Sequence, residues 1–336
     1  MYHRLMLDIL CVGDAKIDIF LKIPESNPYF GLDKEKNKLL ITFGEKIHVE
    51  RYILEIGGNA ANTAVGISRL GLNVGLCAEI GKDELSQKIL TRLKNENIDR
   101  KLLLQTDEDT SVSIALSYKG ERTLLTEHVK RKHNFDFSKL QTKFIYLTSL
   151  GAEWEKTYEK VLDFVKKNNV KLAFNPGSVQ LENRGKVVME IIENSDYLFV
   201  NKEEAEEILY GKQLQLGKVS ENEIKKLLYG LRGLGVKNVV ITDGENGSYA
   251  ETEDNQTYHL GIIKVDLAEK TGAGDAYSSG FLAAILHGLE SREAMKWGAI
   301  DSANAIQGIG AQVNLLTKTG MEDKLKESKE LITEKL

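Results

Sequence analysis

A short turn of small residues, Gly272-Ala273-Gly274, is the part of this sequence best suited to hold an anion. It lies between a β-prone segment, 257–265, and a run of small and apolar residues, 276–287, that predicts a helix. Backbone N–H groups where a helix begins have no intrahelical partner, and the helix dipole adds partial positive charge there. Because glycine has no side chain to obstruct approach, the turn predicts a seat for a phosphate or another developing anion.

Asp275 follows this turn directly and suggests a second chemical role. A carboxylate would repel phosphate, so Asp275 is not expected to bind the anion itself. It could instead take a proton from a hydroxyl group that attacks phosphorus. The structural alternative is that Asp275 caps the helix and that the glycines only form the turn.

Two longer motifs resemble the signatures of a known family. Residues 271–281, T-G-A-G-D-A-Y-S-S-G-F, resemble the C-terminal signature of the PfkB (ribokinase-like) family of sugar and nucleoside kinases. Residues 57–71, G-G-N-A-A-N-T-A-V-G-I-S-R-L-G, resemble the N-terminal signature of the same family. The motifs occur in the family's order, and the resemblance covers nearly the whole chain. It implies an α/β ribokinase-like fold of three layers, with a mostly parallel central sheet, helices on both faces, and a small β-sheet lid over the sugar.

Four residues in the N-terminal part match positions that bind the acceptor in similar kinases: Asp18, Gly58, Asn59 and Asn62. A carboxylate can accept hydrogen bonds from two neighbouring hydroxyls, and an amide offers donors as well as an acceptor. The alternatives are that Asp18 is an exposed strand charge, that Asn59 is a helix N-cap, and that Gly57-Gly58 is a hinge.

Two strand ends match the nucleotide and metal motifs of the family. Asn201 and Glu204 match its N-x-x-E motif, in which the carboxylate would hold Mg²⁺ largely through water. Thr242, Gly244 and Gly247 match, by their spacing, a loop that binds the nucleotide. Both motifs have structural explanations too, because acidic residues favour a first helical turn and D-G or N-G pairs favour hairpins.

The residues before the glycine turn depart from the family pattern. The family commonly has Asp-Thr-Thr there, and members that bind K⁺ use the Asp and the second Thr. This chain has Glu269-Lys270-Thr271, so Glu269 and Thr271 are the candidates for a monovalent cation. The longer carboxylate beside a lysine argues against the ion, and Lys270 could supply the charge instead.

Two other segments have open interpretations. The basic run Lys130-Arg131-Lys132-His133 is usually a solvated loop, but it could also lend charge to a transferring phosphoryl group. Asp301 and Asn304 are candidates for contact near the adenine, although the family pattern is hard to align there.

Composition sets limits on the class of protein. The chain has 336 residues, is 42% hydrophobic and carries a formal charge of −5, which suits a soluble globular protein and argues against broad binding to nucleic acid or anionic membranes. Cys11 and Cys77 lie in apolar runs and predict buried thiols. Neither a secretory signal nor a run of membrane-spanning length is recognised, so the expected compartment is the cytoplasm.

Short apolar runs that alternate with helical patterns predict a parallel sheet covered by helices. We expect one kinase domain over residues 1–336, with lid strands drawn from about 14–24, 38–56 and 110–128. The polar segment 24–38 is expected to be a surface loop, and the tail, 320–336, a charged helix-former.

Together these patterns predict an ATP- and Mg²⁺-dependent kinase that phosphorylates a hydroxyl of a small sugar. A nucleoside such as adenosine is the alternative acceptor. A non-catalytic sugar-binding regulator on the same fold is the alternative from another functional class. An exposed lid sheet would also suit a homodimer.

Overall fold

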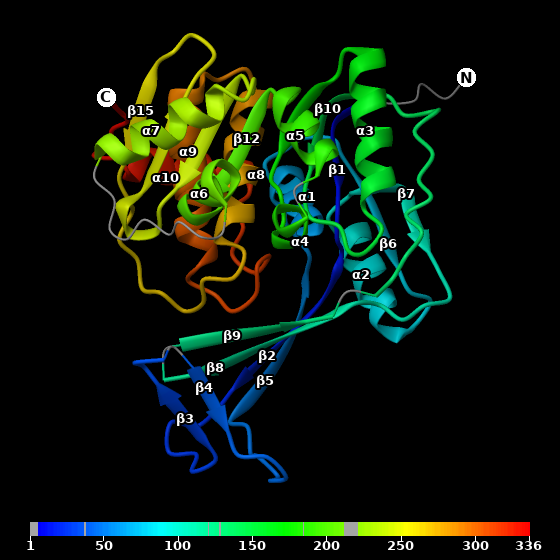
Figure 1. Ribbon diagram of the computed structural model, residues 1–336, viewed down its shortest axis with the longest axis vertical. Helices are drawn as coiled ribbons and strands as arrows, with labels where there is room; N and C mark the ends of the chain where they lie inside the picture. The colour runs from blue at the N-terminus through cyan, green and yellow to red at the C-terminus, as the bar shows by residue number, and fades with distance from the viewer. Residues whose placement is uncertain (1–5, 37, 120, 128, 184, 212–220) are drawn as a thin grey trace.

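The computed structural model describes residues 6–36, 38–119, 121–127, 129–183, 185–211 and 221–336 (Figure 1). Within them, a ten-stranded sheet has the order β16-β15-β14-β13-β12-β11-β10-β1-β6-β7. Neighbouring strands are parallel from β7 across to β13 and antiparallel from β13 to β16. The strands are β1 (Leu7–Val12), β6 (Val74–Ile80), β7 (Asp99–Gln105), β10 (Thr142–Leu147), β11 (Lys171–Phe174), β12 (Tyr197–Asn201), β13 (Asn238–Thr242), β14 (Ser248–Glu251), β15 (Thr257–Leu260) and β16 (Glu334–Lys335).

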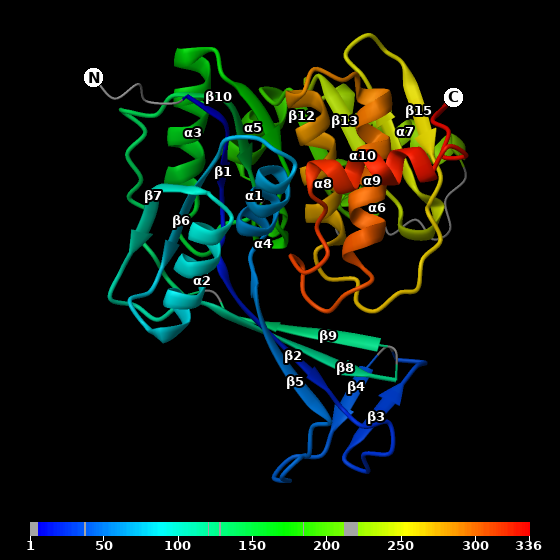
Figure 2. The ribbon, with the colours of Figure 1, turned by 180° about the vertical axis from the view of Figure 1, so that it is seen from behind.

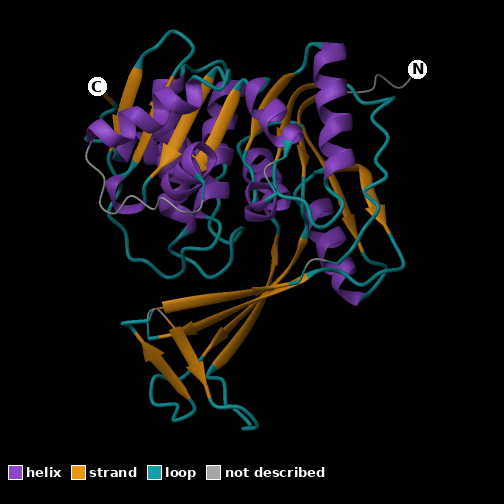
Figure 3. Ribbon diagram, viewed as in Figure 1, coloured by secondary structure: helices purple, strands orange, loops and turns teal. Residues whose placement is uncertain are grey.

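Helices cover both faces of this sheet (Figures 2 and 3). Side chains alternate between the faces along a strand, so Ile9 and Cys11 of β1 pack into one core while Leu10 and Val12 pack into the other. The first core is covered by α1 (Asn59–Arg69), α2 (Glu84–Asn95), α8 (Ala273–Leu286), α9 (Ser291–Ala305) and α10 (Lys318–Glu327). The second core is covered by α3 (Glu155–Asn168), α4 (Ser178–Glu182), α5 (Lys186–Glu193), α6 (Lys202–Tyr210) and α7 (Glu221–Arg232). The predicted three-layer α/β fold is confirmed.

A smaller sheet, which we call the lid, projects from the main body (Figure 1). It consists of β2 (Lys16–Lys22), β5 (Arg51–Gly57), β8 (Val112–Tyr118) and β9 (Glu121–Thr126), in the order β5-β2-β8-β9. The pairs β2–β5 and β8–β9 are antiparallel, whereas β2 and β8 are parallel. The lid thus brings Asp18 on β2 and the residues of β9 onto one small sheet.

Some elements differ from the expectation. The segment 24–38 is not only a loop, because it contains β3 (Phe30–Asp33). This strand pairs with β4 (Lys38–Ile41) in a separate two-stranded sheet, so β4 does not join the lid. The strand β7 is also not predicted from the sequence, because its first three residues are charged and its apolar run is only three leucines long. The tail is attached to the main body, since β16 pairs with β15.

Both cysteines are buried free thiols, and burial raises the pKa of Cys11 and of Cys77. The expectation of unpaired thiols in the core is therefore correct. Among the described residues, no helix has the length and apolar character needed to cross a bilayer.

Candidate active site

The glycine turn opens α8, one turn earlier than the sequence predicts. The helix starts at Ala273, and its N-cap is Gly272 with φ 82°. A side chain on Gly272 would be strained and would lie 2.3 Å from the Cβ of Ala311. At Gly274, by contrast, an added Cβ would have nothing within 4 Å. The first turn of α8 therefore presents its backbone to open space at Gly274.

Asp275 lies in the first turn of α8 but does not cap the helix. Its side chain is buried, and its Oδ2 accepts a hydrogen bond of 2.8 Å from Nδ2 of Asn62 on α1. Burial raises the pKa of Asp275 to about 7; the bond from Asn62 opposes the rise, the charge of Asp18 adds to it, and Lys16 opposes it. The carboxylate therefore belongs to a charged cluster and is poised to exchange a proton near neutral pH.

Asn62 is held from its other side. Its Oδ1 accepts a 3.0 Å hydrogen bond from Nε2 of Gln312, which is itself buried. The backbone carbonyl of Gln312 in turn accepts from the guanidinium of Arg69 on α1. Asn62 is therefore fixed between Gln312 and Asp275. The second N–H of its amide remains available to a bound substrate. No sequence motif indicates Gln312, because the contact joins segments far apart in the chain.

Asp18 lies on the lid strand β2 with its carboxylate turned inward, and only 6% of the residue is exposed. The carboxylate packs on Gly57 of the neighbouring strand, where an added Cβ would lie 1.9 Å from Oδ2. Burial raises the pKa of Asp18, while the charges of Lys16 and Arg122 oppose the rise. An exposed strand charge is therefore the wrong interpretation of Asp18.

The start of α1 brings the other acceptor candidates beside this carboxylate. Gly58 is the N-cap, with φ 95°, and an added Cβ would lie 2.4 Å from the carbonyl oxygen of Asp14. Asn59 is therefore the first helical residue and not the cap. Its side-chain amide makes no hydrogen bond to the described part of the chain, so it is available to a ligand.

Asn201 and Glu204 form a capping box at the start of α6. The Asn201 side chain accepts from the N–H of Glu204, and Oε2 of Glu204 accepts from the N–H of Asn201, each at 2.8 Å. Burial raises the pKa of Glu204 to about 7, the bond from Asn201 opposes the rise, and the charges of Glu203, Glu207 and Asp275 add to it. Glu204 therefore has a structural role, and its carboxylate is also close enough to Asp275 to feel its charge.

The carboxylates of Glu204 and Asp275 lie near enough to act on each other, and such a pair suits a hydrated divalent cation. No group of three or more His, Cys, Asp or Glu side chains with metal-binding geometry occurs among the described residues. A Mg²⁺ ion beside Glu204 would then take most of its ligands from water and phosphate oxygens, which is the usual arrangement for this ion.

The segment from Thr242 to Gly247 is both a hairpin turn and an open loop. It joins β13 to the antiparallel strand β14 through a short 3₁₀ turn, Gly244–Asn246. Gly247 is required by the hairpin, because its φ is 88° and an added Cβ would lie 2.1 Å from the carbonyl oxygen of Leu260. Gly244, with φ 50°, faces open space, so a ligand can approach its backbone.

Glu269 and Thr271 face a residue of the lid. Nη1 of Arg122, on β9, lies 2.8 Å from Oε1 of Glu269 and also donates to Oγ1 of Thr271. Lys270, the residue expected to supply the charge, is exposed and not part of this contact. The side-chain oxygens predicted for a monovalent cation are therefore already bound to a guanidinium.

The remaining candidates have structural partners. Arg131 and His133 are buried: the Arg131 guanidinium donates to Oγ1 of Thr106, and the backbone N–H of His133 donates to Glu79. The prediction of a wholly solvated basic loop is wrong for these two residues, although Lys130 and Lys132 are exposed.

Asp301 is also committed to the core. It is fully buried and accepts hydrogen bonds from Ser279 and from the N–H of Leu316, so this side chain is not exposed to a nucleotide in the structure. Nδ2 of Asn304 donates to the carbonyl of Asn314, so the amide of Asn304 is partly committed as well.

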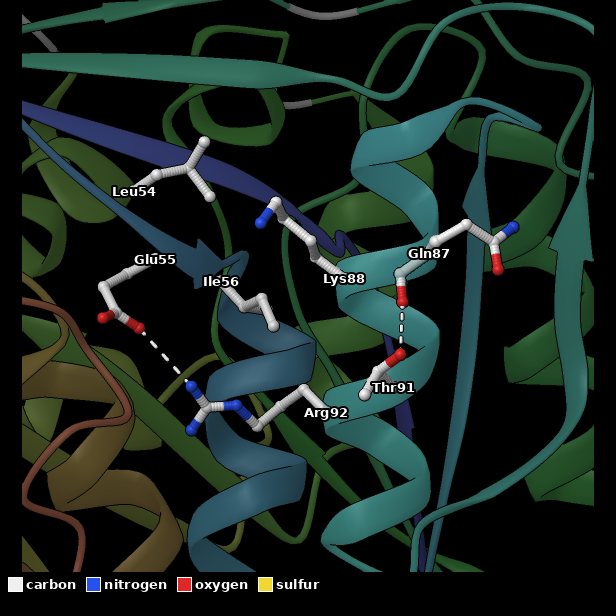
Figure 4. A pocket seen from close by; sticks show the side chains of 7 residues that line it. All are labelled: Leu54, Glu55, Ile56, Gln87, Lys88, Thr91 and Arg92. Atoms are coloured by element: carbon white, nitrogen blue, oxygen red, sulfur yellow. Dashed lines mark hydrogen bonds and ion pairs between the residues drawn. The ribbon is translucent and has the colours of Figure 1, made fainter.

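An open groove of about 400 Å³ lies elsewhere, between the lid strand β5 and α2 (Figure 4). Its lining includes Glu55 and Arg92, whose charged atoms are 3.5 Å apart. None of the predicted site residues lines it. The candidate site is therefore identified by the chemistry around Asp275 and not by the size of a hollow.

Comparison with known proteins identifies the family of this chain. The model of the pfkB family carbohydrate kinases matches residues 6–318. The chain is 26% identical to the ATP-dependent 6-phosphofructokinase of Thermoanaerobacterium thermosaccharolyticum, over 92% of this chain and 90% of that protein. It is 27% identical to the nucleoside kinase of Methanocaldococcus jannaschii, over 93% and 94% of the two chains. Its fold resembles Arabidopsis thaliana ribokinase complexed with ribose and ATP, with a TM-score of 0.76, 18% identity, and coverage of 96% and 99%. This chain belongs to the pfkB family of carbohydrate kinases, enzymes that transfer phosphate to a hydroxyl group.

Proposed function

We propose that this enzyme transfers the γ-phosphoryl group of ATP to a hydroxyl of a small sugar, with Asp275 as the general base. The observation that carries the proposal is the position of a buried carboxylate, with a pKa of about 7, beside the open first turn of α8. A base whose pKa lies near the operating pH is ionised often enough to act and basic enough to accept the hydroxyl proton. The N–H groups of Gly272 and Gly274 hold the charge that develops on the phosphoryl group, and the N–H of Ala273 joins them by giving up its long bond of 3.3 Å to the carbonyl of Lys270.

The acceptor lies between the lid and α1 in this proposal. Asp18 accepts from its hydroxyls, the free amide of Asn59 donates and accepts, and the side-chain-free Gly58 lets the sugar approach α1. The remaining N–H of Asn62 contacts the acceptor while its neighbour holds Asp275. The lid excludes water that would otherwise hydrolyse ATP.

The nucleotide lies on the other side of the glycine turn. Thr242, Gly244 and Gly247 contact its phosphates and nucleoside, and Asn201 lies next to them because β12 and β13 are neighbours. Glu204 would hold Mg²⁺ through water, and the ion would supply positive charge to the phosphates. The two buried, unoxidised thiols support a cytoplasmic location for this enzyme.

A nucleoside is the second candidate acceptor. The similarity to a nucleoside kinase, at 27% identity over 93% of this chain, supports this alternative. A catalytically silent regulator is disfavoured, because Asp275, its glycine turn and the Asn201–Glu204 pair are all intact.

ADP release in the presence of ATP and Mg²⁺ tests this function. Ribose, fructose, fructose 6-phosphate, 2-keto-3-deoxygluconate and adenosine should be offered separately to the purified enzyme. A sugar that accelerates ADP release in the wild type but not in Asp275→Asn supports the proposal, and activity with adenosine alone selects the nucleoside alternative. If a sugar binds saturably but no compound in the panel is phosphorylated, the result would favour the regulator.

The pH dependence of kcat/KM tests the role of the Asn62–Asp275 bond. The value for the wild type should fall as the pH drops through about 7, because protonated Asp275 can no longer accept a proton. The bond from Asn62 lowers the pKa of Asp275, so Asn62→Ala should move this acid limb to higher pH. Asn59→Ala is the matched control: it should raise KM for the acceptor and leave the limb in place. If Asn62→Ala changes KM but does not move the acid limb, Asn62 binds the acceptor and does not control the pKa of Asp275.

The lid also supports the proposal of a homodimer. Tyr52 of β5 and Leu124 and Leu125 of β9 are exposed on it, and the neighbouring Phe43 is 95% exposed. Large apolar side chains on an open sheet commonly mark an interface. Analytical ultracentrifugation should find a dimer that Leu124→Lys weakens, whereas a monomer at micromolar concentration would exclude it.

A further inference from the structure

Arg122 is the point where the lid binds the segment that leads into α8. The strand β9 is the edge strand of the lid and runs along the side nearest to the main body (Figures 1 and 2). From there Arg122 reaches Glu269 and Thr271, residues almost 150 positions later in the chain. Because Thr271 immediately precedes Gly272, this contact joins the lid to the proposed anion seat through one peptide bond.

The contact neutralises a carboxylate that is otherwise enclosed. The side chain of Glu269 is only 10% exposed, and its Oε1 also accepts from the N–H and the Oγ1 of Thr271, at 3.2 and 3.0 Å. These bonds fix the carboxylate in a tight turn, but they bring no positive charge. The guanidinium of Arg122 supplies that charge through charge-assisted hydrogen bonds.

A monovalent cation does not fit beside these side chains. An ion bound to Oε1 of Glu269 and Oγ1 of Thr271 would lie against the guanidinium, and the two positive charges would repel each other. Binding of K⁺ to these oxygens therefore requires Arg122 to leave. The guanidinium of Arg122 already supplies the positive charge beside Glu269.

We infer that Arg122 is a positioning residue that replaces a monovalent cation beside the glycine turn and couples lid closure to the arrangement of that turn. This inference rests on the proposed roles of Asp275 and the glycine turn. Burial raises the pKa of Asp18, the carboxylate proposed to hold the acceptor, and the charge of Arg122 opposes this rise. When the lid is closed, the guanidinium of Arg122 thus acts on Asp18 in the acceptor site and on Glu269 beside the glycine turn. When the lid opens, Glu269 loses its counter-charge.

Arg122→Gln tests this role, and Arg51→Gln is the matched control. Arg51 is an exposed residue of the lid strand β5, and its side chain has no hydrogen bond or ion pair within the described part of the chain. Loss of a hydrogen bond to a charged group suggests that kcat falls about 10- to 100-fold in Arg122→Gln, and the unfolding midpoint should also fall because Glu269 loses its counter-charge. Arg122→Lys should recover part of the loss because it restores the charge, and Arg51→Gln should match the wild type. Equal kcat values for Arg122→Gln and Arg51→Gln would overturn the inference.

Two measurements test whether the enzyme is independent of K⁺: the rate of turnover, and the thermal unfolding midpoint, which needs no turnover. Rates and thermal unfolding midpoints of the wild type should be the same in KCl as in choline chloride at equal ionic strength. In Arg122→Gln, K⁺ should raise the midpoint selectively, because Glu269 and Thr271 are then free to bind it. A wild-type rate or midpoint that depends on K⁺ contradicts the inference, whereas failure of every acceptor in the panel contradicts the proposed function instead.

Discussion

Replacing Asp275 with Asn should lower kcat by about 10²- to 10⁴-fold, the usual contribution of a general base. The amide has nearly the same size, and its oxygen can still accept the hydrogen bond from Asn62. It cannot accept the proton of the attacking hydroxyl, so the chemical step is slowed while binding is preserved. Steady-state ADP release and equilibrium binding of the acceptor identified by the panel measure the two effects separately. A variant with most of the wild-type kcat would refute the assigned role.

The same variant should also be more stable than the wild type above neutral pH. The pKa of Asp275 rises from 3.8 to about 7 on folding, so the folded state disfavours the charged form. That cost develops as the pH increases from about 4, and it is complete only above about 7. The amide of the Asp275→Asn variant carries no charge and avoids the cost. Urea unfolding at pH 8 and pH 5 should therefore show a larger gain for Asp275→Asn at pH 8.

The opposite result would have a clear meaning. If the substitution lowered the free energy of unfolding by a similar amount at both pH values, Asp275 would be acting mainly as a structural residue. A carboxylate kept in the core at a cost to stability, by contrast, is typical of a catalytic group.

The sequence predicts the main layers of this fold because their signals are local. Short apolar strands such as Val74–Ile80 lie beside helical patterns, and the glycine turn shows where a helix entrance stays open. The strand β7 is missed for the same reason: its charged start, 99–101, leaves an apolar run of only three leucines, and the strand is defined by its pairing with β6. Edge strands depend on their neighbours more than on their own residues.

The partners of the site residues could not be predicted. Asp275 is recognisable from its motif, yet its bond to Asn62 and the contact of Gln312 behind it join residues more than 200 positions apart. Arg122 has no motif at all, and its partner Glu269 is noticeable only as a departure from a family pattern. Such side-chain contacts are set by how α1 packs against α8 and by how the lid meets the segment before α8, which no local pattern encodes.

Gly274→Ala should lower kcat without lowering stability, because the phosphoryl group needs the space beside Gly274 and the fold does not. The added methyl group would meet no protein atom within 4 Å, and the backbone of Gly274 needs no left-handed conformation. In a helix alanine is favoured over glycine by up to about 1 kcal/mol, so the variant should be at least as stable as the wild type. The methyl group would nevertheless occupy the seat and hold the phosphoryl group away from the N–H donors. Loss of one such donor typically lowers kcat by about 10²- to 10³-fold, and we expect a loss in this range.

Two other glycines complete this test. Gly31 on β3 also has no positive φ, an added Cβ there would meet only the side chain of Leu40 at 3.7 Å or more, and it is not one of the site residues, so Gly31→Ala should retain both stability and kcat. Gly272→Ala should be destabilised, because its φ of 82° and the nearby Ala311 leave no room for a side chain. A loss of kcat without a loss of stability is therefore expected only for Gly274→Ala of the three. If that variant kept the wild-type kcat, the phosphoryl group could not lie against the first turn of α8, and Asp275 would have no reacting hydroxyl beside it.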